Sequence, residues 1–207
     1  MTALVVAVVA APGVAFADGH PPAVSLRPFL LVTEQGFTAK QSFKAVFGQS
    51  VEPFLGGGVE LVLHDRVYVD LAASRFQKTG QRAFLFNGQA FQLGLPLVVT
   101  ETPFEVSGGY RFLPGHRINP YIGAGFGSYG YKETSDTSAA GENVDTRHAG
   151  FLVSGGAEFR LHPWVSVSAD VQYTHITGIL GSSGISKDAG ESDLGGVAAR
   201  FKVLVGR

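Results

Sequence analysis

Residues 165–173 read VSVSADVQY and alternate without interruption between two kinds of side chain. The odd-numbered positions hold Val, Val, Ala, Val and Tyr, whereas the even-numbered positions hold Ser, Ser, Asp and Gln. Successive residues of a β-strand point to opposite faces of the sheet, so this period of two gives the strand one apolar and one polar face. The stretch therefore predicts a strand that separates an apolar environment from a polar one.

The same alternation recurs along the chain, at 67–74, 151–161 and 197–205 among other places. Short connections alternate strictly with long ones and divide the chain into eight predicted strands, at about 25–37, 51–63, 66–77, 91–112, 118–132, 148–161, 164–176 and 193–206. An even number of antiparallel strands with short turns at one end and long loops at the other is typical of a transmembrane barrel. The predicted fold is an all-β, eight-stranded, antiparallel up-and-down transmembrane β-barrel.

The predicted strand at 91–112 is longer than one membrane span requires. Its apolar positions change parity between Val99 and Phe104, and Pro103 lies between them. Proline interrupts a regular strand ladder, and an extra residue on one strand reverses the faces that follow. These features predict a β-bulge near Pro103.

Composition excludes several classes of protein. The 207 residues carry a net charge of −1, which gives no electrostatic footprint for nucleic acid. The absence of Cys excludes thiol nucleophiles, cysteinyl metal sites and disulfides. Low charge (16%) combined with 28 Gly and 16 Phe favours a Gly-rich barrel over a soluble helical protein.

The N-terminal segment has the composition of a targeting signal. Residues 1–17 are uncharged, almost entirely apolar, and end in Ala15-Phe16-Ala17, the small-x-small pattern that precedes signal-peptidase cleavage. This segment is too short to span a membrane as a helix. We therefore predict a signal peptide over 1–17, followed by a barrel domain over 18–207.

The segment PYIGAGFG at Pro120–Gly127, with Gly109-Tyr110-Arg111-Phe112 before it and a Tyr-rich stretch after it, resembles the small bacterial outer-membrane β-barrel superfamily. That superfamily includes the OmpW, OmpX and OmpA-barrel proteins and the opacity-type porin-family surface proteins. The resemblance implies a Gram-negative-type outer membrane as the location, with outer-membrane lipids and the outer-membrane assembly machinery as partners. The chain departs from the family pattern at its end, Val205-Gly206-Arg207, where an aromatic residue is usual.

Several charged residues fall on the polar face of the predicted strands, and Arg27 joins them. The predicted lumenal charges are Glu60, Asp70, Glu105, Arg111, Glu158, Arg160, Asp170, Arg200 and Lys202. An eight-stranded barrel is only wide enough to be filled by side chains, and buried charges need partners. We therefore expect a salt-bridged polar core, with Asp170 paired to Arg200. An ion or solute path would be expected to carry an excess of one sign.

Six histidines occur, but none at HxH or HExxH spacing, so the sequence predicts no metal ion and no cofactor. His175 has a separate interpretation. Lipid-modifying outer-membrane hydrolases are barrels with a His–Ser–acid site, and their His-x-Ser-Asn element corresponds here to His175-Ile176-Thr177-Gly178. The nucleophile is replaced by Thr, and the sequence shows no obvious acidic partner.

The long connection at 38–50 has the pattern of a short amphipathic helix. Thr38 and Gln41 form a possible capping box, and Gly48 is suited to end the helix. The apolar residues on one helical face are Ala39, Phe43, Val46 and Phe47. We expect this helix at the outer interface or over the mouth of the barrel.

The connection around 78–90 has the pattern of an extended β-ribbon. Asn87-Gly88 is a strong signal for a tight hairpin, and Phe84, Phe86 and Phe91 lie close to it. Two interpretations remain open. These aromatics either pack on the helix that carries Phe43 and Phe47 and close the mouth, or they form an uptake site for a small apolar solute or an adhesive tip.

Three classes of function follow from these patterns. The main prediction is a non-enzymatic, monomeric outer-membrane barrel that serves envelope structure, surface adhesion or the passage of small apolar solutes. The alternative is a lipid-modifying barrel enzyme that uses His175. A secreted, lipocalin-like ligand-binding barrel is the third, and it would require an apolar lumen and a polar outer face.

Overall fold

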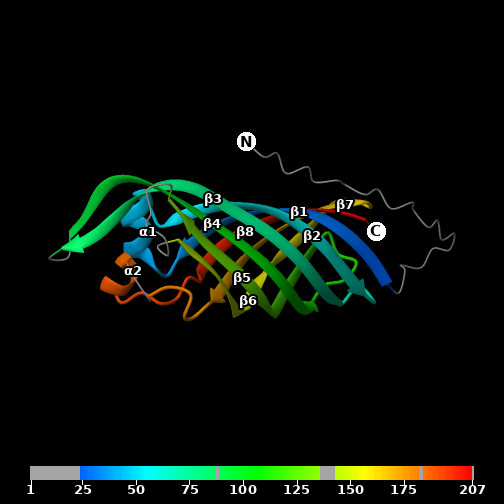
Figure 1. The fold of residues 1–207 in the computed structure, drawn as a ribbon. Helices are drawn as coiled ribbons and strands as arrows, with labels where there is room; N and C mark the ends of the chain where they lie inside the picture. Colours follow the sequence, from blue (N-terminus) through cyan, green and yellow to red (C-terminus); the bar gives the residue numbers. More distant parts are fainter. Residues whose placement is uncertain (1–23, 87–88, 136–142, 182–183, 207) are drawn as a thin grey trace.

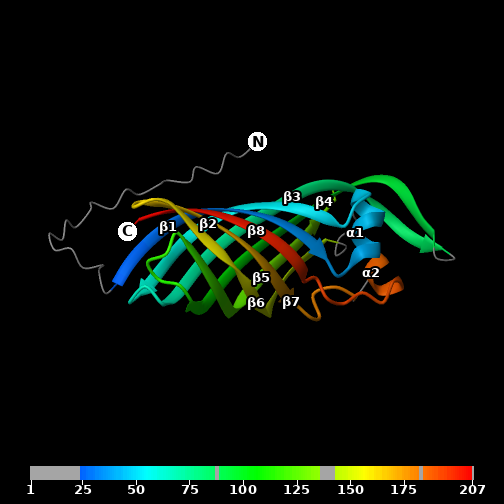
Figure 2. The same ribbon diagram turned by 180° about the vertical axis from the view of Figure 1, so that it is seen from behind.

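The eight predicted strands form and close into a single ring (Figures 1 and 2). The computed structural model describes residues 24–86, 89–135, 143–181 and 184–206, so the predicted signal peptide lies outside the described residues. In chain order the elements are β1 (Val24–Phe37), α1 (Lys40–Phe47), β2 (Val51–Leu63), β3 (Val67–Phe86), β4 (Gln89–Arg111), β5 (Ile118–Thr134), β6 (Val144–His162), β7 (Val165–His175), α2 (Gly184–Asp188) and β8 (Gly196–Val205). The all-β barrel is confirmed.

Every strand pairs antiparallel with both of its neighbours. The ring closes between β1 and β8, where Leu30 lies opposite Val203, while on its other side Leu30 lies opposite Gly57 of β2. Closure removes the sheet edges, so the backbone N–H and C=O groups along the strands bond within the barrel, as a bilayer requires. Among the described residues, neither helix has the length and apolar character needed to cross a membrane.

The two faces of the barrel have opposite chemistry. Apolar side chains cover the outside, where Phe126 is 75% exposed and Leu55 is 66% exposed. Charged side chains such as Arg27 and Glu60 fill the inside and are 6% exposed. A lipocalin-like barrel would show the reverse pattern, so that interpretation is wrong.

The long connections gather at one end of the barrel, opposite the C-terminus (Figure 1). Both helices lie there, and β3 and β4 extend past them as a two-stranded ribbon that leaves the barrel wall (Figure 2). We call this end the mouth. The predicted Asn87-Gly88 turn at the ribbon tip lies outside the described residues, but the strands on either side pair up to Phe86 and Gln89.

The predicted bulge near Pro103 is wrong. The register between β3 and β4 is the same on both sides of Pro103 and shifts only between Gln81 and Ala83, at the base of the ribbon. The odd-numbered residues of β4 face the lumen all the way from Leu97 to Arg111. The apolar parity changes because the lumen itself changes along the strand, from charged in the barrel to apolar at the mouth.

The helix predicted in 38–50 forms as α1, and its end is confirmed. Gly48 adopts a φ of 79°, and its N–H donates to the Lys44 carbonyl. The predicted capping box is wrong, because Ala39 occupies the N-cap position and no side-chain hydrogen bond caps the helix from there. A residue far along the chain satisfies the helix start instead.

Candidate functional site

Buried charged side chains, together with two tyrosines, link all eight strands through the lumen. We call the following set the ion belt: Arg27, Glu60, Asp70, Glu105, Arg111, Tyr121, Tyr129, Glu158, Asp170, Arg200 and Lys202. Each charged member has a salt-bridge partner within the set. All of them except Glu105 are only 3–6% exposed. Every second residue of a strand faces the lumen, so side chains from strands far apart in the sequence meet there.

Arg27 joins three strands at the end of the belt farthest from the mouth. Its Nη1 lies 2.8 Å from Glu158 Oε1, and its Nε donates to Glu60 Oε1 at 2.9 Å. Arg111 Nη2 donates to the second oxygen of Glu158 at 2.6 Å. Two guanidinium groups therefore clamp one carboxylate, which is the planar two-point geometry that makes Arg–carboxylate pairs strong.

The next level of the belt holds the pair predicted from the sequence. Arg200 Nε donates to Asp170 Oδ1 at 2.6 Å, and the two residues lie directly opposite each other on β8 and β7. Tyr121 donates its hydroxyl to the other oxygen of Asp170 at 2.6 Å. Lys202, on the same face of β8, pairs with Asp70 across the lumen.

One of the predicted lumenal charges does not join the belt. Arg160 has the lumenal parity of Glu158 but lies exposed, two residues nearer the short turns. At that height the barrel opens to solvent, so the parity no longer implies burial.

The sequence interpretation also missed Glu101, which is 3% exposed in the lumen. The incorrect bulge near Pro103 would have turned Glu101 outward, although its parity with Glu105 and Arg111 shows where it points.

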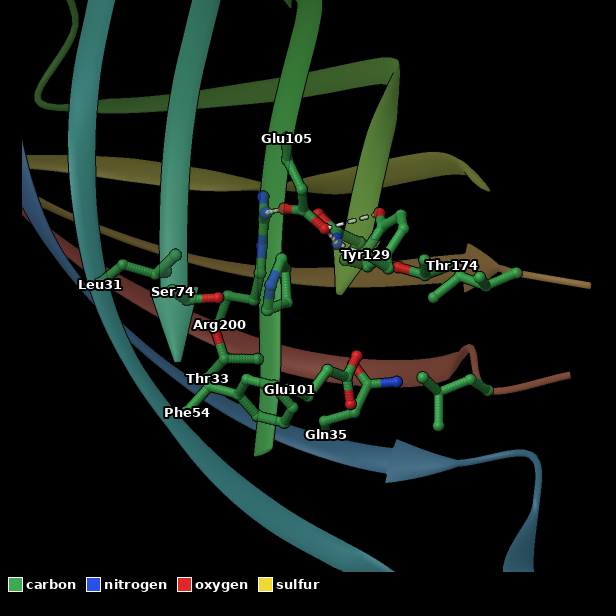
Figure 3. A pocket seen from close by; sticks show the side chains of 14 residues that line it. Leu31, Thr33, Gln35, Phe54, Ser74, Glu101, Glu105, Tyr129, Thr174 and Arg200 are labelled. Carbon is green, nitrogen blue, oxygen red and sulfur yellow. Dashed lines mark hydrogen bonds and ion pairs between the residues drawn. The ribbon is translucent and has the colours of Figure 1, made fainter. Parts of the chain in front are cut away.

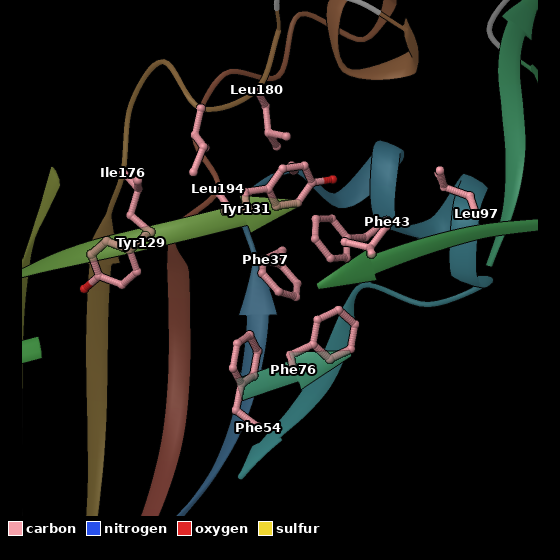
Figure 4. Close-up of a cluster of buried hydrophobic side chains, with 13 residues drawn as sticks. Phe37, Phe43, Phe54, Phe76, Leu97, Tyr129, Tyr131, Ile176, Leu180 and Leu194 are labelled. Atoms are coloured by element: carbon pink, nitrogen blue, oxygen red, sulfur yellow. The ribbon is translucent and has the colours of Figure 1, made fainter. Parts of the chain in front are cut away.

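An apolar plug closes the mouth above the ion belt (Figure 4). We call it the mouth cluster, and its buried members are Phe37, Ala39, Phe43, Phe54, Phe76, Leu97, Val99, Tyr129, Tyr131, Ile176, Ile179, Leu180 and Leu194. Phe43 of α1 stacks on Phe37 with ring centroids 3.7 Å apart. Phe47 packs against the cluster from the same helix and meets Phe76 edge-on. The helix thus covers the barrel end with the apolar face predicted for it.

Glu191 holds α1 in place from the neighbouring connection, which joins β7 to β8. Its carboxylate accepts hydrogen bonds from the N–H groups of Gln41 and Ser42, both at 2.9 Å, and from the Ser42 hydroxyl at 2.7 Å. These N–H groups have no partner within the helix, and a carboxylate there also meets the positive end of the helix dipole. The long connection between β7 and β8 therefore supplies the cap that the sequence assigned to Thr38.

A small cavity of about 30 Å³ lies between the ion belt and the mouth cluster (Figure 3). Members of both groups line it, including Arg200 from below and Leu194 from above. The cavity has room for about one or two water molecules. The interior therefore consists of a charged level, a water-sized space and an apolar level.

The family model described as "Outer membrane protein beta-barrel domain" matches residues 1–201. The chain belongs to this outer-membrane β-barrel family. Its location is therefore the bacterial outer membrane. Barrels of this kind have short periplasmic turns and long extracellular loops, so the mouth and the ribbon face outward.

Two solved structures show how far the fold of this outer-membrane barrel is shared. Neisserial surface protein A aligns with a TM-score of 0.55 at 12% identity, over 89% of this chain and 97% of that one. OprG from Pseudomonas aeruginosa aligns with a TM-score of 0.53 at 13% identity, over 91% of this chain and 95% of that one. At these identities the similarity concerns the fold alone. No curated protein matches the sequence.

The ribbon aromatics of this outer-membrane barrel do not form a lid. Phe84 and Phe91 lie opposite each other on β3 and β4 and stack at 5.5 Å, but each is more than 40% exposed and neither joins the mouth cluster. The side chain of Phe86 lies outside the described residues. The prediction that Phe84 and Phe91 pack on α1 is therefore wrong, because the ribbon carries them beyond the helix.

His175 has an acidic partner that the sequence interpretation missed. Its Nδ1 lies 2.8 Å from Asp193 Oδ2, while Asp193 Oδ1 accepts the N–H groups of Ile176 and Gly195. Asp193 thus fastens the end of β7 to the start of β8. Within the described part of the chain, no Ser or Thr hydroxyl bonds to His175, and no group of three His, Asp or Glu side chains is placed to hold a metal ion.

The first prediction concerns the pair of Asp170 and Arg200. Asp170→Asn or Arg200→Met alone should lower the free energy of unfolding by about 3–5 kcal/mol, because the remaining charge stays buried without its partner. The double variant should lose less than the sum of the two. Urea unfolding of the refolded barrel in vesicles measures this. The exposed pair Lys132–Asp145 is the matched control and should show almost no coupling. Additive losses at Asp170 and Arg200 would contradict the pairing.

The second prediction concerns the Glu191 cap. Glu191→Ala should speed hydrogen exchange at the Gln41 and Ser42 amides by about fivefold, since losing a helix cap costs about 1 kcal/mol. The barrel strands should keep their protection. Asp188→Ala, which removes an exposed carboxylate from α2 in the same connection, is the control and should leave both amides unchanged. Unchanged exchange in Glu191→Ala would show that the carboxylate does not hold the helix.

Proposed function

We propose that this outer-membrane barrel is a non-enzymatic surface protein that attaches to apolar surfaces through the tip of its β3–β4 ribbon. The observation that carries the proposal is the stacked pair of Phe84 and Phe91. Both rings are exposed and lie outside the mouth cluster, on the ribbon at the long-loop end of the barrel, which faces outward in barrels of this kind. An apolar pair displayed to water in this way is typical of a contact surface.

The interior of the barrel supports attachment over transport. A solute that entered at the mouth would have to displace Phe37 and Phe43, and then separate ion pairs such as Asp170–Arg200. On the periplasmic side of the lumen the charges also pair with one another instead of presenting a line of one sign, which is the usual arrangement of an ion path. The barrel is therefore suited to anchor the ribbon, and envelope structure is a consequence of the same sealed core.

The base of the ribbon is fixed, so the aromatic tip has a defined place above the membrane. Gln92 donates to the Ala45 carbonyl of α1 at 3.1 Å. Gly80 passes so close to the helix that a Cβ there would lie 2.5 Å from the Val46 carbonyl oxygen. Rigid aromatic side chains on a supported strand lose little entropy on binding, which favours their use as contacts.

The third prediction tests this role. The double variant Phe84→Ser/Phe91→Ser should reduce adhesion of expressing cells to octyl-coated surfaces and their partition into hexadecane. Its heat-dependent gel mobility should stay that of the wild type, because the pair contributes only about 0.2–1 kcal/mol across the strands. Gln81→Ser, at an exposed polar position of the ribbon, is the control. Unchanged adhesion, with or without lost heat stability, would overturn the proposal.

A second candidate function rests on His175 and Asp193. Their contact would supply the base and the acid of a hydrolytic site at the outer end of β7, where the Phe151 ring lies 5.3 Å from the His175 ring. A lipid-modifying enzyme would also need a hydroxyl nucleophile within reach of that ring. The fourth prediction separates the two candidates: His175→Ala should leave the lipid composition of expressing cells unchanged. A lipid product that disappears in His175→Ala would favour the enzyme.

A further inference from the structure

The cavity between the ion belt and the mouth cluster has an uneven charge balance. On the periplasmic side of it, three acids meet three bases: Glu60, Asp70 and Glu158 against Arg27, Arg111 and Lys202. From the level of the cavity toward the mouth, four buried acids meet two bases: Glu52, Glu101, Glu105 and Asp170 against Lys78 and Arg200. The described part of the upper lumen therefore holds two more carboxyl groups than basic groups.

Two of these acids, Glu105 and Asp170, have hydrogen-bond donors and a basic partner. Glu105 accepts hydrogen bonds from Tyr129 at 2.9 Å and from Gln172 at 3.0 Å, and it lies 3.6 Å from Arg200. Asp170 is held by Arg200 and by the Tyr121 hydroxyl. Their negative charge is therefore spread over several donors.

Glu101 has no such support. Its carboxyl group is buried, and among the described residues its Oε2 has no hydrogen-bond partner. Figure 3 shows its side chain in the cavity close to that of Gln35, with Thr33 also lining the space. A buried carboxylate without a donor or a counter-charge is strongly destabilising, so a positively charged group is required beside it if it is ionised.

We propose that Glu101 binds a small monovalent cation of the alkali-metal type in this cavity, with side-chain oxygens of Thr33 and Gln35 as further ligands. Carboxylate, amide and hydroxyl oxygens are the ligands that hard cations prefer. One unpaired carboxylate balances a single positive charge. A cavity of about 30 Å³ has room for such an ion together with about one water molecule. This site is independent of the attachment proposed for the ribbon.

Neutralisation of Glu101 by a cation and neutralisation by a proton lead to different predictions for the stability of the barrel. If the Glu101 carboxyl group is held neutral by a proton, the stability of the barrel does not depend on which cation the buffer contains. If Glu101 binds a cation, the ion stabilises only the folded barrel, so stability rises with ion concentration. The two cases separate without any measurement of adhesion.

The fifth prediction compares the refolded barrel in NaCl with the same barrel in N-methylglucamine chloride at equal ionic strength. The unfolding midpoint should rise by about 3 °C for each tenfold increase in Na⁺ above the dissociation constant. Glu101→Gln should lose this dependence. Glu34→Gln, which removes an exposed carboxylate from the outer face of β1, is the matched control and should keep it. Equal midpoints in the two salts would overturn the site, and a response to Ca²⁺ alone would overturn the monovalent assignment.

A direct measurement covers the case in which Glu101→Gln fails to fold. Crystals of the wild-type barrel soaked in RbCl should show an anomalous peak within ligand distance of the Glu101 carboxylate. The peak should disappear when the soak contains N-methylglucamine chloride instead. A cavity without anomalous signal under saturating RbCl would overturn the proposal.

Discussion

Closing eight strands into a ring satisfies the backbone in a bilayer, but it leaves a lumen so narrow that side chains must fill it. The chain fills this space largely with charged side chains that form ion pairs, and every strand contributes to the hydrogen-bonded set. Arg27 alone connects β1 with β2 and β6 through Glu60 and Glu158. Such pairs are poor sources of net stability but penalise any arrangement that separates them. The ion belt therefore favours one register for the whole barrel.

The mouth follows from the same constraint with different chemistry. Toward the outside the lumen passes from ion pairs to aromatic rings, and α1 covers the end because Phe43 and Phe47 bury one of its faces. Glu191, contributed by the last long connection, completes the start of that helix. With both levels filled, the ribbon still exposes apolar side chains at this end, Phe84 and Phe91 among them. This division between a sealed anchor and an exposed tip is the basis of the proposed attachment.

The sequence predicted the strands well because the outer face touches lipid and the inner face does not, so the alternation is strong in segments such as 165–173. It also identified Asp170 and Arg200 as partners. Both have the lumenal parity, and they lie at similar heights along the barrel axis when residues are counted from the β6–β7 turn and from the end of β8. It failed where the lumen changed character, as at Glu101, because a change of apolar parity has the same appearance as a bulge. It also failed for Glu191 and Asp193, whose contacts join long connections with no periodic pattern. Arg160 shows that parity alone does not define depth.

The central claim is that the lumen is sealed and that the outer end carries the function. Conductance of the wild-type barrel in a planar lipid bilayer tests it most directly, with insertion verified by the heat-dependent gel mobility of the same preparation. The account predicts no stepwise current in KCl from folded, inserted protein. Stable ohmic steps of uniform size would contradict it, because ions would then cross both the mouth cluster and the ion belt.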